Sequence, residues 1–271
     1  MDYPENLIFS LEITNGYVFR QIFELYDKLV INSIPIFFKE SGVTIRACIL
    51  STRDNRKLIS DIEIFTDDVI EYYINTDLTT IKKEESDTPC QIEKISMNTV
   101  KSVLKSISKS NSVRLYKTTD SDDIRIEIKG ANVENSKISS GRCHSSDYDI
   151  SNFDDLSETP NIKIDIGQFC STMKGIMRDT DFTIFKIYDK GLVVEGRNTI
   201  GSVVKNNSWG KTETKDCYEC KVGTNFVKAL CKINGMANYS IIKLYCNKNS
   251  SFKLNHKIGD FGEHNIYISE N

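Results

Sequence analysis

Apolar residues recur at helical spacing in four separate segments of the chain, and short strand-like runs follow each of them. The four segments are residues 16–30, about 98–109, about 165–178 and about 224–233. Apolar side chains three and four residues apart share one face of a helix. Each segment therefore predicts an amphipathic helix with one buried side and one polar side.

Between these segments, apolar and polar residues alternate with a period of two. The clearest runs are residues 124–129, in which isoleucine alternates with charged residues, and residues 252–257. This period is typical of antiparallel strands that have one buried face. Each half of the chain thus predicts antiparallel sheets with two helices, an α+β arrangement used twice.

Three polar stretches interrupt the pattern. Residues 147–161 are polar and acidic, with Pro160 near their end and Ile150, Phe153 and Leu156 as apolar interruptions. We interpret this stretch as an interdomain linker, which predicts domains at residues 1–146 and 162–271. Residues 79–93 are rich in Lys and Glu, and residues 206–216 are polar, so we expect surface loops there.

Composition narrows the choice of function. The chain has 271 residues, of which 39% are hydrophobic, enough for two buried cores. Its formal charge is −3, so any contact with DNA needs a local basic patch. We see no leader pattern and no apolar run near the roughly 20 residues of a membrane span, so we expect an intracellular protein without a membrane partner. Its eight cysteines are then expected to be reduced.

Signatures of catalysis or metal binding are weak. Cys217 and Cys220 are spaced like half of a zinc site that His256 or His264 would complete, but a second cysteine pair is missing. Buried or loop cysteines are the simpler interpretation, and a metal-dependent enzyme is the minor alternative. Only three histidines are present, and no nucleophile-elbow, paired-carboxylate or phosphate-loop pattern. We therefore expect no enzymatic activity, no cofactor and no metal.

Short runs of residues follow the order and spacing of one protein family. They are Phe9-Ser10-Leu11-Glu12, Ser41-Gly42-Val43, Gly167-Gln168-Phe169, Asp189-Lys190-Gly191-Leu192-Val193 and, most specific, Lys257-Ile258-Gly259-Asp260-Phe261-Gly262 before Tyr267-Ile268. On these residues the chain resembles proliferating cell nuclear antigen, the eukaryotic and archaeal sliding clamp, over nearly its whole length. The resemblance implies the DNA clamp fold, with two similar clamp domains per subunit and a ring of three subunits.

The resemblance also implies a function and a set of partners. A clamp is a non-enzymatic processivity factor that encircles duplex DNA without reading its sequence and recruits replication and repair proteins. The implied partners are double-stranded DNA, a DNA polymerase and other peptide-motif proteins, a clamp loader ATPase and two further copies of the chain. The nucleus or a viral replication site is the implied location. The alternative is a clamp-like factor for viral transcription or damage signalling, monomeric or in a mixed ring.

Cations on the outer faces of the predicted helices are the candidates for contact with phosphates. Acidic residues on these faces are few, namely Glu24, Asp27 and Asp179. For any one helix, lysines that only add solubility are the alternative, but all four helices carry them. The candidates are Arg20, Lys28, Lys101, Lys105, Lys109, Lys174, Arg178, Lys228 and Lys232.

Further site residues follow from the resemblance alone. Partner peptides in the family dock beside the linker and the C-terminal strand, where the matching apolar positions are Phe153, Leu156, Tyr267 and Ile268. Ordinary core is the alternative, above all for Ile268. Subunit edges are expected near residues 145–150 and 201–207, and the interface candidates there are Tyr148, Ile150 and Val203. The chain departs from the family in its short linker, in Asp27 where a cation is common, and in the insertion at residues 79–93.

Overall fold

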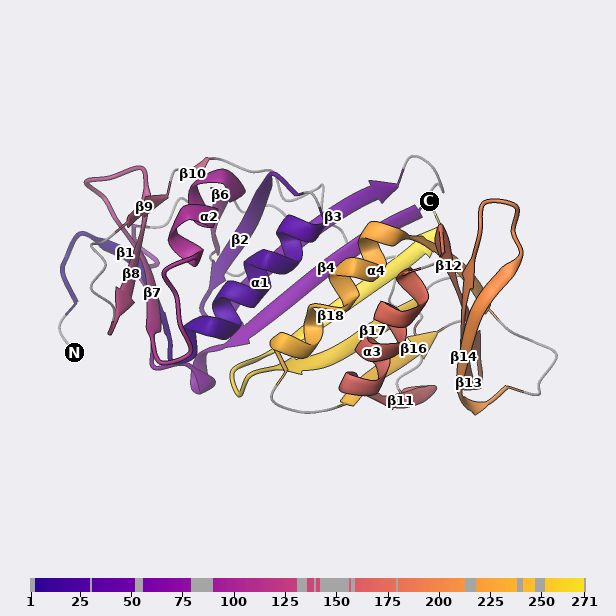
Figure 1. Ribbon diagram of the computed structural model, residues 1–271. Helices are drawn as coiled ribbons and strands as arrows, with labels where there is room; N and C mark the ends of the chain where they lie inside the picture. The colour runs from indigo at the N-terminus through magenta and orange to yellow at the C-terminus, as the bar shows by residue number, and fades with distance from the viewer. Residues whose placement is uncertain are drawn as a thin grey trace.

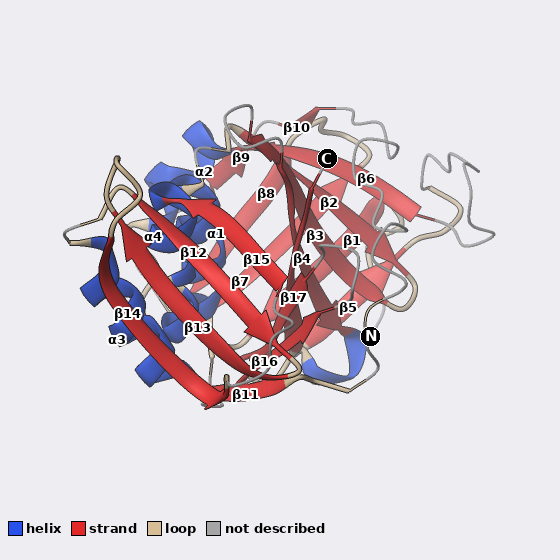
Figure 2. Ribbon diagram, turned by 90° about the vertical axis from the view of Figure 1, so that its right-hand side faces the viewer, coloured by secondary structure: helices blue, strands red, loops and turns tan. Residues whose placement is uncertain are grey.

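The computed structural model describes residues 3–29, 31–51, 56–78, 90–130, 136–138, 140–141, 156, 159–178, 180–212, 218–237, 241–246 and 252–270. In this part of the chain, three antiparallel sheets and four α-helices form (Figure 1). The helices lie together on one side of the sheets (Figure 2). The α+β fold with antiparallel sheets and two helices in each half is thereby confirmed.

The elements of the N-terminal half follow in the predicted order of helix and strands. They are β1 (Leu7–Ile13), α1 (Gly16–Lys28), β2 (Ser33–Lys39), β3 (Gly42–Ser51), β4 (Arg56–Phe65), the 3-10 helix η1 (Thr66–Asp68), β5 (Glu71–Ile74), β6 (Cys90–Ser96), α2 (Met97–Leu104), β7 (Ser112–Thr118), β8 (Ile124–Lys129), β9 (Ser136–Ile138) and β10 (Ser140–Gly141).

The C-terminal half repeats this order. Its elements are β11 (Ile162–Asp165), α3 (Ile166–Met177), β12 (Phe182–Tyr188), β13 (Lys190–Arg197), β14 (Val203–Lys211), β15 (Tyr218–Gly223), α4 (Thr224–Leu230), the 3-10 helix η4 (Ile233–Gly235), β16 (Ile241–Cys246), β17 (Phe252–Ile258) and β18 (Gly262–Glu270).

The strand order shows that the repeat is architectural. One sheet has the order β5-β1-β7-β8-β9, the long sheet β10-β6-β2-β3-β4-β18-β17-β16-β11, and the last sheet β14-β13-β12-β15. In the repeat, β1, β7, β8 and β9 correspond to β11, β16, β17 and β18, and β6-β2-β3-β4 corresponds to β15-β12-β13-β14. The two halves meet where β4 pairs with β18, in one register from Ile64↔Gly262 to Arg56↔Glu270. The long sheet is thus continuous across both halves.

Local sequence explains where the helices begin and which side they bury. The side chain of Asn15 caps α1 by accepting a hydrogen bond from the Val18 backbone nitrogen, and Asp165 caps α3 by accepting one from that of Gln168. Phe19, Ile22, Phe23 and Tyr26 of α1 are fully buried, as the helical spacing predicts. The four helices and the sheets share one continuous hydrophobic core.

Three sequence predictions are corrected. The helix expected over residues 98–109 ends at Leu104, and Ile107 is buried in the turn that follows. Residues 90–93 belong to strand β6, in which buried Glu93 is neutralised by Lys117 at 2.6 Å. Residues 206–211 belong to β14, a strand with largely exposed side chains at the end of its sheet. In both strands, polar side chains conceal the period that marks a strand.

Other predictions fall on parts of the chain outside the description. Tyr148, Ile150 and Phe153 lie there, as does all of the expected linker except Leu156 and residues 159–161. The domain boundaries therefore remain predictions. In the part of the chain that is described, no helix is both long enough and apolar enough to cross a membrane.

Candidate functional site

The basic residues predicted from the helix faces come together in one layer. Helices α2, α1, α4 and α3 pack in that order (Figure 1). All nine predicted cations lie on these helices or in the turns directly after them. The helices themselves contain only two carboxylates, Glu24 and Asp27, and the described part of the turn after α3 adds Asp181. An acidic chain thus presents a helix layer with a strong excess of positive charge.

Three of the nine cations are held by those two carboxylates. Glu24 on α1 pairs with Arg20 at 2.7 Å and with Lys232 at 3.3 Å. Burial opposes ionisation of Glu24, but the hydrogen bonds from both cations outweigh it and lower the pKa of that carboxyl. Asp27 pairs with Lys101 at 2.6 Å, which joins α1 to α2. These pairs couple neighbouring helices and reduce the charge available to a ligand.

The remaining cations point toward solvent. Lys28, Lys105, Lys174, Arg178 and Lys228 are exposed and form no ion pair within the described residues. The ammonium of Lys109 lies 5.3 Å from the centre of the Tyr17 ring, within cation–π distance. These six side chains are the part of the predicted set that can meet phosphates directly.

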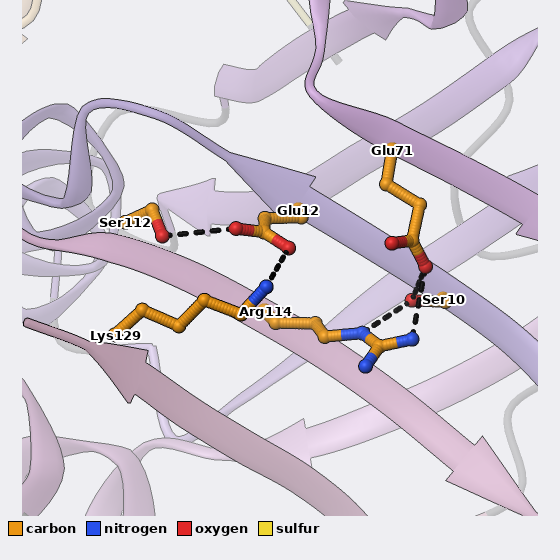
Figure 3. Close-up of polar contacts among 6 residues, drawn as sticks. All are labelled: Ser10, Glu12, Glu71, Ser112, Arg114 and Lys129. Atoms are coloured by element: carbon orange, nitrogen blue, oxygen red, sulfur yellow. Dashed lines mark hydrogen bonds and ion pairs between the residues drawn. The ribbon is translucent and has the colours of Figure 1, made fainter.

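Carboxylates on the sheets are neutralised by neighbouring strands. Figure 3 shows two such networks, which lie on β1, β5, β7 and β8. Buried Glu12 accepts hydrogen bonds from Ser112 at 3.0 Å and Lys129 at 2.5 Å, and Glu71 accepts one from Arg114 at 2.9 Å. Charges that are paired in this way add little to the field at the helix layer. The positive layer therefore keeps its sign although the whole chain is acidic.

A second, smaller hydrophobic cluster lies apart from the main core. It consists of Ile59 on β4 and Tyr267 on β18, with Cys48 of β3 and Leu156 packed against them. Leu156 from the expected linker and Tyr267 from the C-terminal strand are thus brought together, as the resemblance implied. Ile268 is 1% exposed and belongs to the main core, because successive residues of a strand face opposite sides of the sheet.

The same face of the sheet holds residues that sequence reasoning missed. Strand register pairs Lys253 on β17 with Tyr245 on β16 on one side and with Tyr267 on β18 on the other. The ammonium of Lys253 is 5.6 Å from the Tyr245 ring centre and 5.3 Å from the Tyr267 ring centre. Nothing in the spacing along the chain indicates this arrangement, because three strands build it.

Apolar side chains are exposed beside the edge strand β14. Val203 and Val204 are 50% and 44% exposed, and Ile200 in the preceding turn is 86% exposed. The inner side of the strand packs on α3, where Lys205 donates a hydrogen bond to the carbonyl of Gly175 at 3.0 Å. Val203 is therefore at a sheet edge, as expected. At the other end of the molecule (Figure 1), β9 forms the edge of its own sheet within the described residues.

His256 and His264 are part of the core. The Nε2 atom of His256 lies 2.9 Å from Nδ1 of His264, and both rings are buried. Cys220 is buried in β15, whereas Cys217 lies outside the described residues. Among the described residues, no three His, Cys, Asp or Glu side chains are grouped so that they could hold a metal ion.

Comparison with known proteins identifies the fold. No family model matches the sequence, and no curated protein matches it. Proliferating cell nuclear antigen from Entamoeba histolytica matches with a TM-score of 0.73 at 10% identity, over 98% of this chain and 99% of that one. The PCNA2–PCNA3 complex from Sulfolobus tokodaii matches with a TM-score of 0.72 at 15% identity, over 96% and 98% of the two chains.

A third structure extends the comparison. The A. fulgidus PCNA bound to the C-terminal region of FEN-1 matches with a TM-score of 0.66 at 16% identity, over 97% of this chain and 98% of that one. All three likenesses extend over nearly the full length of both chains, so they include both halves and the joint between them. The chain therefore has the fold of the PCNA sliding clamps, built from a divergent sequence.

Proposed function

We propose that this protein is a DNA sliding clamp, a non-enzymatic processivity factor whose helix layer faces duplex DNA. The observation that carries the proposal is the charge of that layer, where the helices and the turns after them carry nine cations but few carboxylates, namely Glu24, Asp27, Asp179 and Asp181, in a chain of net charge −3. Flexible cations without a base-reading element contact phosphates and not sequence, so DNA is held but can slide.

The repeat supports a ring of identical subunits. Inside the chain, β4 of the first half pairs with β18 of the second. Their counterparts, β14 and β9, end their sheets within the described residues, and we propose that β14 of one copy pairs with β9 of the next in the same way. Repeating this joint adds two domains with each copy, and three copies give the six domains of the proposed ring. Exposed Val203 and Val204 would be covered at this contact.

The small hydrophobic cluster supports a recruiting role. One similar structure is a PCNA bound to the C-terminal region of FEN-1, so a protein of this fold holds a terminal segment of another protein. In this chain Leu156 and Tyr267 meet on the face of the sheet opposite to that of Ile268, which belongs to the core that the helices share. We propose this site for peptide motifs of a DNA polymerase and other replication or repair proteins. A clamp loader ATPase would place the ring on DNA in the nucleus or at a viral replication site.

The solution mass tests the ring. Light scattering over a range of concentration and salt is expected to give three times the chain mass of 30.9 kDa. A Val203→Lys, Val204→Lys variant should shift the mass toward one chain, since it buries two charges in the proposed contact. The same substitution at Ile241, which is 48% exposed on β16, in the sheet that contains neither β14 nor β9, is the control. A wild-type protein that stays monomeric at high concentration would refute the homotrimer.

A mixed ring is the second candidate. It is favoured by the similarity to the PCNA2–PCNA3 complex, in which two different chains assemble. A clamp-like factor in transcription or damage signalling would then need a second chain. Co-purification of a second chain of the same fold in fixed ratio, with a monomeric isolated protein, supports this alternative over the homotrimer.

A further inference from the structure

Five side chains form a single row across the outer face of the long sheet. Strand register aligns Tyr245 on β16 with Lys253 on β17, then Tyr267 on β18, Ile59 on β4 and Cys48 on β3. The row crosses the joint between the two halves, and Leu156 packs on its apolar end. Its opposite end carries one positive charge between two aromatic rings.

The ammonium of Lys253 has aromatic neighbours but no carboxylate partner. Its two cation–π distances, 5.6 Å and 5.3 Å, place it between Tyr245 and Tyr267. It forms no ion pair within the described residues. Of the three acids that act on it through space, Glu263, Glu63 and Asp61, the last is held by Arg46 through two hydrogen bonds of 2.8 Å and 3.1 Å. Glu263 accepts a hydrogen bond from Asn255 at 3.2 Å.

Lys253 is also partly withdrawn from water. Burial lowers the pKa of its ammonium, although Glu263, Glu63 and Asp61 act in the opposite direction through space. A half-desolvated cation gains more from a carboxylate than an exposed one does, because less water has to be displaced. The two rings also restrict the lysine, so less side-chain freedom is lost on binding.

We propose that this row selects partner peptides in which an acidic side chain stands next to a large apolar side chain. The apolar side chain would pack at Leu156 and Cys48, and Lys253 would bind the carboxylate between the two tyrosine rings. The choice of occupant follows from charge complementarity, since a basic peptide would be repelled by Lys253 and a wholly apolar one would bury it unpaired. The inference rests on the proposed recruiting role of the cluster and adds a rule for which partners it accepts.

Matched peptides test this rule. The probes are 16-residue fluorescent peptides that contain a glutamine and aromatic residues, the partner motif that the resemblance to PCNA implies, and Asp is moved through the positions that flank the aromatic residues. Each has an Asn counterpart. We expect wild-type protein to prefer one Asp position over its Asn counterpart by roughly tenfold in anisotropy titrations at low salt. In Lys253→Met, which retains a long apolar side chain, the preference should disappear.

A second lysine provides the control. Lys257→Met removes a cation four residues along the same strand and on the same face, and should keep the tenfold preference. If Lys253→Met still prefers the Asp peptide as wild type does, or if wild type never distinguishes Asp from Asn, the selection rule is refuted while peptide binding stands. If no peptide of either kind binds, the recruiting role itself is refuted, and the rule with it.

Discussion

Acid should weaken the joint between the two halves through a buried chain of polar groups. This chain of hydrogen bonds starts at the Lys257 carbonyl, passes through His256 and His264, and reaches Ser60 on β4. The Oγ atom of Ser60 lies 2.8 Å from Nε2 of His264. From Ser60 it continues to the hydroxyl of Tyr26 on α1 at 3.3 Å. The chain thus connects β17, β18, β4 and α1 across the β4–β18 joint.

The hydrogen-bond partners determine the protonation state of both rings. A carbonyl only accepts, so Nδ1 of His256 carries a proton and donates to Lys257. Nε2 of neutral His256 then accepts from Nδ1 of His264, whose unprotonated Nε2 faces the Ser60 hydroxyl. A proton added to Nε2 of His256 would face another N–H. These hydrogen bonds are therefore satisfied when both imidazole rings are neutral.

The energetic consequence follows from the pKa values. Burial lowers the pKa of His256 from 6.5 to about 4, and burial together with His256 lowers that of His264 well below 6.5. At about 1.4 kcal/mol per pH unit, the fall at His256 corresponds to about 3 kcal/mol. Because the folded pKa is depressed, this stability is fully present above pH 6.5. It is lost as the pH falls from 6.5 toward 4.

Urea unfolding at several pH values measures this loss. Between pH 7 and pH 4.5, wild type should lose more unfolding free energy than a His256→Gln, His264→Gln variant, by about 3 kcal/mol. The variant is expected to be less stable at pH 7, so the pH slope is the informative quantity. His144→Gln, which changes the third histidine, is the control. Equal slopes for wild type and the double variant would refute the reasoning.

Three further predictions concern charge. Lys174→Glu with Lys228→Glu should weaken duplex DNA binding and lower the slope of log affinity against log salt by about 2 per subunit, whereas arginine at both positions should preserve it. Glu24→Gln frees two cations and should strengthen DNA binding in the same titration, with an unfolding free energy lower by at most about 1 kcal/mol. Arg46→Met leaves the Asp61 carboxylate buried without its partner and should cost about 3 kcal/mol in urea unfolding, most of which Asp61→Leu in the same chain restores.

Much of the architecture could be predicted because buried faces leave a period in the sequence. Phe19, Ile22 and Phe23 indicate α1, and the isoleucines of residues 124–129 indicate β8, since each pattern matches one side of one element. Residues 206–211 of β14, by contrast, leave no such period and read as a polar loop. An edge strand buries few side chains, so Trp209, whose ring lies 6.1 Å from that of Phe169, is one of its few inward anchors.

The site was only partly predictable because its decisive contacts join distant segments. The cations could be named from helix faces, but the pairing of Lys232 with Glu24 depends on how α4 packs against α1. Likewise, the sequence pattern shows Lys253 only as one polar position in a strand of alternating apolar and polar residues. Its place between two tyrosine rings arises from the register of three strands.

The two kinds of joint in the proposed ring differ in what holds them. The joint inside the chain has a long strand pair, a shared core and the polar chain from His256 to Tyr26. At β14, polar side chains are instead committed to the chain's own helix, where Asn207 donates to Thr172 at 3.0 Å and Lys205 to Gly175. The contact between copies therefore relies on the strand edges and a few exposed apolar side chains.

The contact between copies also joins separate molecules, so it depends on protein concentration. The β4–β18 joint lies within one chain and forms at every concentration. Dilution should therefore open the ring long before either half unfolds. We expect the mass from light scattering to fall toward one chain over a range in which the circular dichroism spectrum and the urea midpoint of the protein do not change. If loss of the assembly and unfolding coincide, the contact between copies is as essential to the fold as the internal joint, and the proposed difference between them is wrong.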